Sequence, residues 1–150
     1  EVSESDFLAI VKDVMGELPK EQQYVILDEL TVLTGSVTPT ATVKLTVNSK
    51  GTTKTEIESS IGAGPVDAAM NAIIKCYKKS GEEYDMKLKE YAIDAVSGGS
   101  DALGHVHITV NDKFGKEYTS EATHEDIVMS SVLSLIKALN KITHAREHPH

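Results

Sequence analysis

Three histidines have the residue type and the spacing that could hold a metal ion. His105 and His107 alternate with Val106 and Ile108, so both imidazoles are expected on one face of a strand. His124 is expected near them, at the start of a later helix. Imidazole nitrogens are common zinc ligands, so a free-standing α+β metal-binding protein or enzyme is one interpretation. The other is that the histidines are solvent-facing positions of the strand. We assign no metal ligand and keep the metal protein as the alternative function.

A second stretch could bind an anion. Gly62, Gly64 and Pro65 form a turn that leads directly into an apolar helix, because proline favours the first helical position. Asp67 follows two positions later, where the helix dipole favours a carboxylate. The unpaired amides at a helix start point outward and can bind a carboxylate group. A well-capped core helix is the other interpretation of the same residues.

No catalytic motif is found in the chain. The sequence has no Gly-x-Ser-x-Gly, no phosphate-binding loop with Lys-Ser/Thr and no His-Glu-x-x-His. Its single cysteine, Cys76, lies inside the apolar run after Pro65 with no histidine beside it. That position indicates a small buried side chain rather than a nucleophile. We therefore predict no catalytic residue and no cofactor in this chain.

Composition narrows the class of protein and its partners. The 150 residues are 40% apolar and 25% charged, which is typical of one soluble globular domain. The net charge of −8 argues against nucleic acid and against an anionic membrane surface as partners. The sequence has no apolar run of about 20 residues and no charged-then-apolar leader, so we expect a cytoplasmic protein. Because the chain begins at Glu1, we expect a processed product or a piece of a longer protein.

The elements that would position these side chains occur twice. Residues 43–50 and 106–113 match in pattern and mostly in identity, and each is followed by glycine, a polar strand and a helix with an aspartate near its start. Helices are predicted from Pro65 and over 124–142. Alternating residues predict strands over 24–34, 42–47, 53–61, 86–93, 106–110 and 116–122. We therefore predict an α+β fold of two pseudo-repeated βββα units with antiparallel strands, about 24–80 and 86–142.

Both ends of the chain lie outside these two units. The capping residues Ser3 to Asp6 precede apolar residues at helical spacing, which predicts a first helix near 4–17. The segment 144–150 is expected to be a disordered tail.

The predicted helices carry more apolar surface than six strands would cover. The helix over 124–142 has a broad apolar face, and Ala68, Ala69 and Ala72 give the other helix a face of small residues. A symmetric pair of chains would cover both faces, so we predict that the helices pack at a homodimer interface.

Several motifs in one order resemble a known family. They are Pro39–Leu45, Gly64–Ala69, Leu88–Tyr91 and Gly98–Gly104. Over about residues 24–142 the chain resembles the C-terminal regulatory (dimerisation) domain of the 2-isopropylmalate synthases and citramalate synthases. The resemblance implies a regulatory domain over 20–143 and, in 1–19, the end of a linker subdomain as a short helix. The parent polypeptide would be an acetyl-CoA-dependent acyltransferase. The family often has glycine before the last helix, where this chain has Ser120 to Asp126.

The resemblance also implies what the domain binds. Such a module has no catalysis of its own: it binds leucine or isoleucine, inhibits the catalytic domain of the same polypeptide by feedback, and dimerises it. A branched-chain amino acid needs amide donors, an ammonium acceptor and an apolar wall, which the two helix starts and nearby strands would supply. Leucine is favoured because the family uses it more often, and no residue here decides between it and isoleucine. The expected effector-binding residues are Gly64, Pro65, Val66, Asp67, Leu88, Tyr91, Ala95, Leu103, Thr123 and Asp126.

Overall fold

The computed structural model describes residues 6–10, 23–81, 84–96 and 103–148 of the chain. Strands and helices alternate in these ranges in two similar series. In chain order the elements are β1 (Asp6–Ile10), β2 (Val25–Thr34), β3 (Thr40–Ser49), β4 (Thr52–Ile61), α1 (Pro65–Lys79), β5 (Met86–Val96), β6 (Leu103–Asp112), β7 (Glu117–His124) and α2 (Ile127–Glu147).

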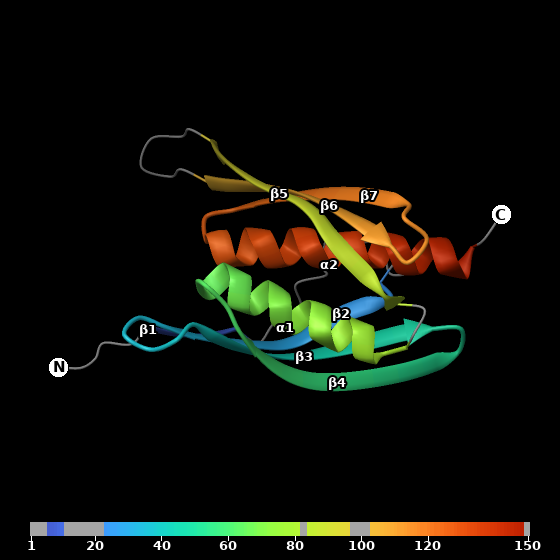
Figure 1. Cartoon of the computed structure of the whole chain (residues 1–150), viewed down its shortest axis with the longest axis horizontal. Helices are drawn as coiled ribbons and strands as arrows, with labels where there is room; N and C mark the ends of the chain where they lie inside the picture. Colours follow the sequence, from blue (N-terminus) through green and yellow to red (C-terminus); the bar gives the residue numbers. More distant parts are fainter. Residues whose placement is uncertain (1–5, 11–22, 82–83, 97–102, 149–150) are drawn as a thin grey trace.

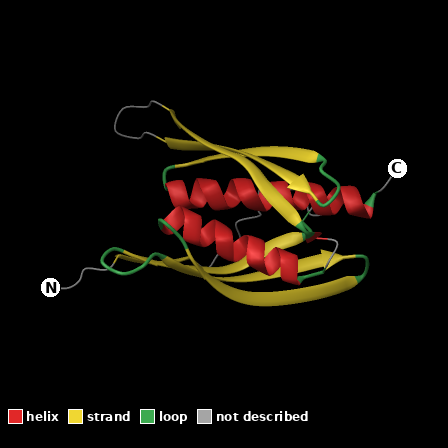
Figure 2. Ribbon diagram, in the orientation of Figure 1, coloured by secondary structure: helices red, strands yellow, loops and turns green. Residues whose placement is uncertain are grey.

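The two helices lie between two sheets, so the domain has three layers (Figure 1, Figure 2). One sheet has the strand order β1-β2-β3-β4 and the other β5-β6-β7, and neighbouring strands are antiparallel in both. The helix α1 packs on β3 and β4, and α2 packs on β6 and β7. Each helix therefore covers the sheet of its own unit, which confirms the predicted α+β fold of two βββα units.

The two units share irregularities as well as their strand order. The first strand of each unit has a register shift, between Leu27 and Glu29 in β2 and between Leu88 and Glu90 in β5. The hairpin that follows the second strand turns through a glycine at positive φ in both units, Gly51 at 75° and Gly115 at 85°. A glycine is suited to this backbone conformation because it has no Cβ. The predicted internal repeat is therefore present in the backbone.

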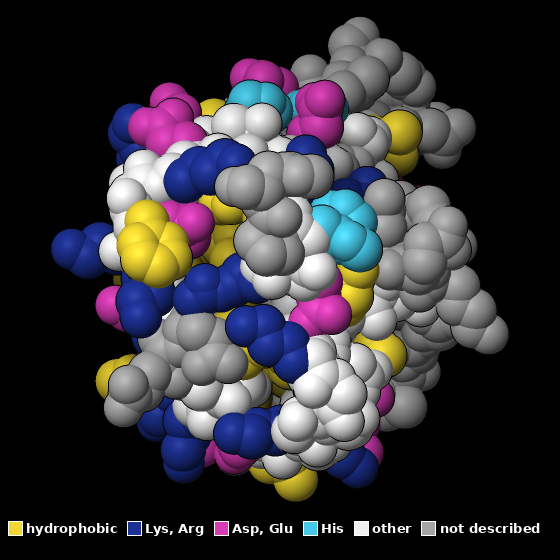
Figure 3. Space-filling view, turned by 90° about the vertical axis from the view of Figure 1, so that its right-hand side faces the viewer, with side chains coloured by type: hydrophobic (Ala, Val, Ile, Leu, Met, Phe, Trp, Pro, Cys, Tyr) yellow, Lys and Arg dark blue, Asp and Glu magenta, His cyan; other side chains and the backbone are white. Residues whose placement is uncertain are grey.

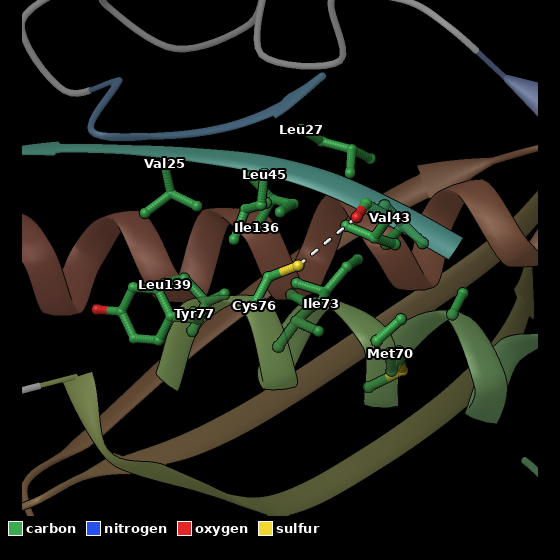
Figure 4. Packing of buried hydrophobic residues seen from close by; sticks show 14 of the residues in the cluster. Val25, Leu27, Val43, Leu45, Met70, Ile73, Cys76, Tyr77, Ile136 and Leu139 are labelled. Atoms are coloured by element: carbon green, nitrogen blue, oxygen red, sulfur yellow. Dashed lines mark hydrogen bonds between the residues drawn. The ribbon is translucent and has the colours of Figure 1, made fainter. Parts of the chain in front are cut away.

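The core lies on both sides of the helices, against the first sheet and against the second. Val43 and Leu45 of β3 face Ile73 and Tyr77 of α1, and each of these side chains is fully buried (Figure 4). Cys76 is 0% exposed, and its thiol donates to the Val43 carbonyl at 3.6 Å. Burial, more than any other factor, raises the pKa of Cys76 to about 11. The interpretation of this cysteine as a small buried side chain is therefore confirmed.

The predicted first helix near 4–17 is wrong where the structure describes it. Residues Asp6–Ile10 form the strand β1, which pairs with Leu30–Thr34 of β2. The remaining part, 11–17, lies outside the described residues. A short apolar run fits a helix face and a strand equally well. In the folded domain the edge of β2 offers hydrogen-bond partners to residues 6–10, and this pairing makes them a strand rather than a helix.

The boundaries predicted for the last helix are also wrong. The strand β7 continues to His124, and α2 begins at Ile127 after Asp126 as its N-cap. At the other end, α2 continues to Glu147, so 144–147 are helical rather than a disordered tail. The Glu147 carboxylate accepts a hydrogen bond from the Lys50 amide at 2.7 Å, which ties this last turn to the β3–β4 hairpin.

The helix faces that were expected to need a second chain are buried within this one. Ala68, Ala69 and Ala72 of α1 are 0% exposed, and so are Val132 and Leu139 of α2. The two sheets enclose the helices from both sides (Figure 1), an arrangement that spacing along the sequence does not reveal. The apolar surface of the helices is therefore no argument for a dimer.

Basic residues gather at the end of the molecule where both helices finish (Figure 3). Lys78 and Lys79 lie in the last turn of α1, and His144 and Arg146 in the last turn of α2. Cations are favourable there because the C-terminal end of a helix dipole is negative.

No helix among the described residues has the length and apolar character needed to cross a membrane.

Candidate functional site

An open groove lies between the start of α1 and the inner face of β5. Its volume is about 430 Å³, and Ile127 of α2 closes one side of it. We call it the α1–β5 groove. Six of the ten predicted effector-binding residues line it: Gly64, Pro65, Val66, Asp67, Leu88 and Tyr91.

The start of α1 supplies hydrogen-bond donors to this groove. Gly64 is the N-cap in an extended conformation and Pro65 is the first helical residue. The first helical hydrogen bond runs from the Ala68 amide to the Gly64 carbonyl at 2.9 Å. The amides of Val66 and Asp67 precede that bond, so the helix itself offers them no carbonyl. Together with the positive end of the helix dipole, they are suited to an anion.

Asp67 and Asn71 fix the turn that precedes α1. The Asp67 carboxylate accepts a hydrogen bond from the Ala63 amide at 2.9 Å, and the Asn71 side-chain amide donates to the Ile61 carbonyl at 3.2 Å. Gly62 lies so close to the helix that a Cβ there would be 2.3 Å from the Ala68 nitrogen. The turn is therefore held tightly against the first turn of α1, and the carboxylate lies at the rim of the groove.

The apolar wall of the groove comes from β5. Leu88 and Ile93 are 39% and 50% exposed, whereas the inward residues of β2, the corresponding first strand of the other unit, are 0–2% exposed. The fold can therefore bury this face completely and leaves it open in the second unit only. Between these two residues Tyr91 is half-buried, and its hydroxyl shares a 2.7 Å hydrogen bond with the Ser131 hydroxyl of α2.

Five groove residues were not predicted from the sequence. Three of them continue the helix face of Asp67 at spacings of three, four and seven residues, and this periodicity could have identified them. Ile93 lies two positions beyond Tyr91 on the same face of the strand, which is also a usable signal. Ile127 comes from a helix whose position only the tertiary structure defines. The five are Met70, Asn71, Ile74, Ile93 and Ile127.

Three of the predicted site residues, Leu103, Thr123 and Asp126, are not among the described residues that line the groove. Leu103 begins β6, and Ala95 pairs with Gly104, although the side chain of Ala95 lies outside what the structure describes. Thr123 belongs to β7, and its hydroxyl is 3.1 Å from His105 Nδ1. The Asp126 carboxylate accepts from the Val128 amide at 2.8 Å as the N-cap of α2. The second helix start is therefore closed by its own cap.

Two of the three histidines considered for a metal site have other partners. His105 Nε2 lies 2.8 Å from the Glu121 carboxylate, and His124 Nδ1 accepts from the Asp126 amide at 2.9 Å. Within the described ranges, no three His, Cys, Asp or Glu side chains are grouped so that they could hold a metal ion. The alternative function as a metal protein therefore finds no site there.

A second hollow, of about 570 Å³, lies between β7 and the C-terminal half of α2. Its two lysines reach the open edge of β7: Lys137 donates to the Glu121 carbonyl at 3.4 Å, and Lys141 donates to the Thr119 carbonyl. These ammonium groups cover backbone acceptors that an edge strand leaves unpaired. The hollow is larger than the α1–β5 groove, but its cationic groups already have structural partners.

Fold and groove together define a duplicated βββα domain with an open apolar groove at the start of one helix. A family model described as the LeuA allosteric (dimerisation) domain matches residues 1–143. Because this match covers nearly the whole chain, the chain belongs to that family.

The relatives carry the names of two related enzymes. The chain is 44% identical over 147 residues to 2-isopropylmalate synthase of Methanocaldococcus jannaschii, which covers 97% of the chain and 26% of the relative. It is 39% identical over 140 residues to a probable 2-isopropylmalate synthase of Archaeoglobus fulgidus, covering 93% and 26%. It is 41% identical over 143 residues to (R)-citramalate synthase of Methanocaldococcus jannaschii, covering 94% and 27%. The chain thus spans about a quarter of the length of each.

Proposed function

We propose that this chain is an allosteric module whose α1–β5 groove binds a branched-chain amino acid, with leucine favoured over isoleucine, as a feedback inhibitor. The observation that carries the proposal is the chemistry of the groove. Two helix amides and one carboxylate lie at one end, and the other lining residues are apolar apart from Asn71. This is the set of partners that a zwitterion with an aliphatic side chain requires. The family's description as an allosteric domain supports the same function.

Each part of the ligand has a matching part of the groove. The ligand carboxylate would accept hydrogen bonds from the amides of Val66 and Asp67. Its ammonium group would lie against the Asp67 carboxylate, which is within reach of the same helix start. The branched side chain would pack on Leu88 and Tyr91. Both charged ends need these partners, because a charge that leaves water unpaired is strongly penalised.

We further propose the context in which the module acts. The relatives' names and their greater length support a parent polypeptide that is a 2-isopropylmalate synthase or a citramalate synthase. We propose that this parent is an acetyl-CoA-dependent acyltransferase of the cytoplasm. The catalytic domain of that polypeptide would be the partner that the module inhibits. No cofactor is proposed for this chain.

We propose that the module assembles as a homodimer, which the description of the family as a dimerisation domain supports. Light scattering at micromolar concentration should give twice the monomer mass of 16.2 kDa. A monomeric mass across that range would contradict the proposed assembly.

Calorimetric titration of the chain tests the ligand. Leucine should bind, and valine should bind about ten-fold or more weakly, because each methylene in an apolar pocket contributes roughly 1–3 kcal/mol. Two analogues test the charged ends: 4-methylpentanoate lacks the ammonium group and leucinamide lacks the carboxylate, and neither should give measurable heat. Strongest binding by isoleucine would change the assigned ligand. Absence of heat with leucine, isoleucine and valine would overturn the proposed function.

A further inference from the structure

We propose that Ser131 is a positioning residue of the α1–β5 groove, which holds the Tyr91 ring in place as the groove wall and so sets which aliphatic side chain fits. The inference rests on the proposed function, because it concerns the amino acid that the groove is proposed to bind. Its starting observation is the 2.7 Å hydrogen bond between the hydroxyls of Tyr91 on β5 and Ser131 on α2.

The depth of Ser131 makes this bond important. Its side chain is 0% exposed, and buried hydroxyls in folded proteins have hydrogen-bond partners. The partner that the structure shows is the hydroxyl of Tyr91, a half-buried residue that lines the groove. The bond turns the polar end of the phenol toward α2. Tyr91 therefore presents its ring to the groove, an apolar surface suited to an aliphatic ligand.

The apolar side chains next to Tyr91 on β5 are themselves exposed. Leu88 and Ile93, on either side of Tyr91 along the strand, are 39% and 50% exposed. The pairing with β6 holds the backbone of β5, but these two neighbours give the groove side of the Tyr91 ring little apolar cover. A single directional bond to a buried residue has a large influence on such a wall, because it fixes both distance and orientation.

The helix α2 contributes to the groove twice. Ile127 lines the groove, and Ser131 lies four residues later, one turn along the same side of the helix. One rigid element thus supplies one wall directly and anchors the Tyr91 wall. The position of α2 therefore sets the distance between the Tyr91 ring and α1, because the hydrogen bond with Ser131 ties the ring to α2.

Loss of the anchor should therefore change selectivity as well as affinity. A ring that is free to move makes poorer contact with the end of a leucine side chain, whereas the shorter valine side chain depends less on that contact. We expect Ser131→Ala to weaken leucine binding about three- to ten-fold, the range that one hydrogen bond spans. Valine binding should fall by less, so the ratio of the two dissociation constants should shrink.

Isothermal titration of the full chain tests this, with Ser134→Ala as a matched control. Ser134 is also 0% exposed on α2, and its hydroxyl also meets a hydroxyl of the second sheet, Ser120 at 3.2 Å, but it does not line the groove. A purely structural role for buried serines predicts similar results for both variants. Our proposal predicts that Ser134→Ala lowers the melting temperature at most and leaves both dissociation constants within about two-fold.

A double-mutant cycle with Tyr91→Phe tests whether Ser131 acts through Tyr91. Tyr91→Phe should weaken leucine binding as much as Ser131→Ala, and the double variant should lose no more than either. Additive losses would overturn the proposal, and so would unchanged leucine affinity in both single variants. If Ser131→Ala does not fold, Tyr91→Phe breaks the same bond from the exposed side, and an unchanged leucine-to-valine ratio there overturns the proposal. If leucine gives no heat with the unaltered chain, the proposed function fails and this inference fails with it.

Discussion

The Asn140 side chain holds the backbone of Val25 from both sides. Its Oδ1 accepts a hydrogen bond from the Val25 amide at 3.0 Å, and its Nδ2 donates to the Val25 carbonyl at 3.0 Å. The same Oδ1 accepts from the Tyr24 amide at 2.6 Å, and the same Nδ2 donates to the Ile136 carbonyl at 3.0 Å. Asn140 is 3% exposed. One side chain of α2 therefore fixes the start of β2, although 115 residues separate the two.

Replacing this asparagine should strongly destabilise the domain. Asn140→Leu keeps a similar volume but removes the side-chain groups that bond the amide and the carbonyl of Val25. Each buried group left unpaired costs about 1–3 kcal/mol, so the free energy of unfolding should fall by at least about 2 kcal/mol in a urea titration. The control is Asn48→Ala, which removes one exposed bond to Thr53 and should cost less than about 1 kcal/mol. Equal effects of the two variants would show that the Asn140 bonds contribute little.

Alanine substitution should destabilise the domain more at Gly62 than at Gly64, the two glycines next to α1. A Cβ on Gly62 would lie 2.3 Å from the Ala68 nitrogen and 2.8 Å from the Ala68 Cα, both backbone atoms that cannot move aside cheaply. A Cβ on Gly64 would meet nothing within 4 Å. Gly62→Ala should therefore lower the free energy of unfolding by about 1–3 kcal/mol, the usual range for overpacking. Gly64→Ala should cost less than about 1 kcal/mol. Thermal unfolding of both variants measures the difference, and a tolerated Gly62→Ala would contradict the close approach.

Local patterns were sufficient to predict most of the fold. The alternation along 42–47, the turn after Asn48 and the proline at the start of α1 each depend on neighbouring residues, so the sequence contains them. The strand β1 depends instead on a free edge of β2, and the burial of the helix faces depends on a second sheet above them. Both are tertiary effects, which a pattern of apolar residues within one segment does not contain.

The residues that line the α1–β5 groove were predicted in part for the same reason. The residues around Pro65 were identified from helix-start chemistry, and Leu88 and Tyr91 from the resemblance and the strand pattern. Thr123 and Asp126 were included because the repeat suggested that both helix starts contribute equally. In the structure Asp126 caps its own helix, and the two units differ at this point. Internal repetition predicts equivalent backbones, but it does not predict which copy keeps an open groove.

The burial of Cys76 has a consequence at high pH. Its pKa is raised to about 11, above the ordinary value of 9.0, so between these values the folded chain keeps a proton that the unfolded chain releases. The stability that this thiol contributes is complete below pH 9 and is lost as the pH rises through 11. The free energy of unfolding should fall by roughly 2 kcal/mol from this residue by pH 11.

Unfolding titrations of the native chain and of Cys76→Ala at pH 8 and pH 11 isolate that contribution. Tyr77, also buried, has a raised pKa through desolvation and is present in both proteins, so it cancels in the difference. The difference in the free energy of unfolding between the native chain and Cys76→Ala should therefore be smaller at pH 11 than at pH 8. The same difference at both pH values would show that the thiol titrates at its ordinary pKa.

Replacing Asp67 should reduce leucine affinity while leaving the chain folded. Its carboxylate accepts one exposed hydrogen bond, from the Ala63 amide at 2.9 Å, and lies near the positive end of the α1 dipole. A carboxylate in that position contributes about 0.3–1 kcal/mol to stability, so Asp67→Ala should remain folded with a slightly lower melting temperature. The proposed ligand, however, loses the acceptor for its ammonium group, and leucine affinity should fall by about ten-fold or more because hydrogen bonds to charged groups contribute about 1.5–3 kcal/mol.

The matched control is Asp94→Ala. Asp94 is an exposed carboxylate on β5 that does not line the groove, so this variant should leave leucine binding unchanged. Equal leucine affinity in Asp67→Ala and in the native chain, measured by titration calorimetry, would exclude Asp67 as the ammonium partner even if leucine binds, and an unfolded Asp67→Ala would assign this carboxylate a structural role.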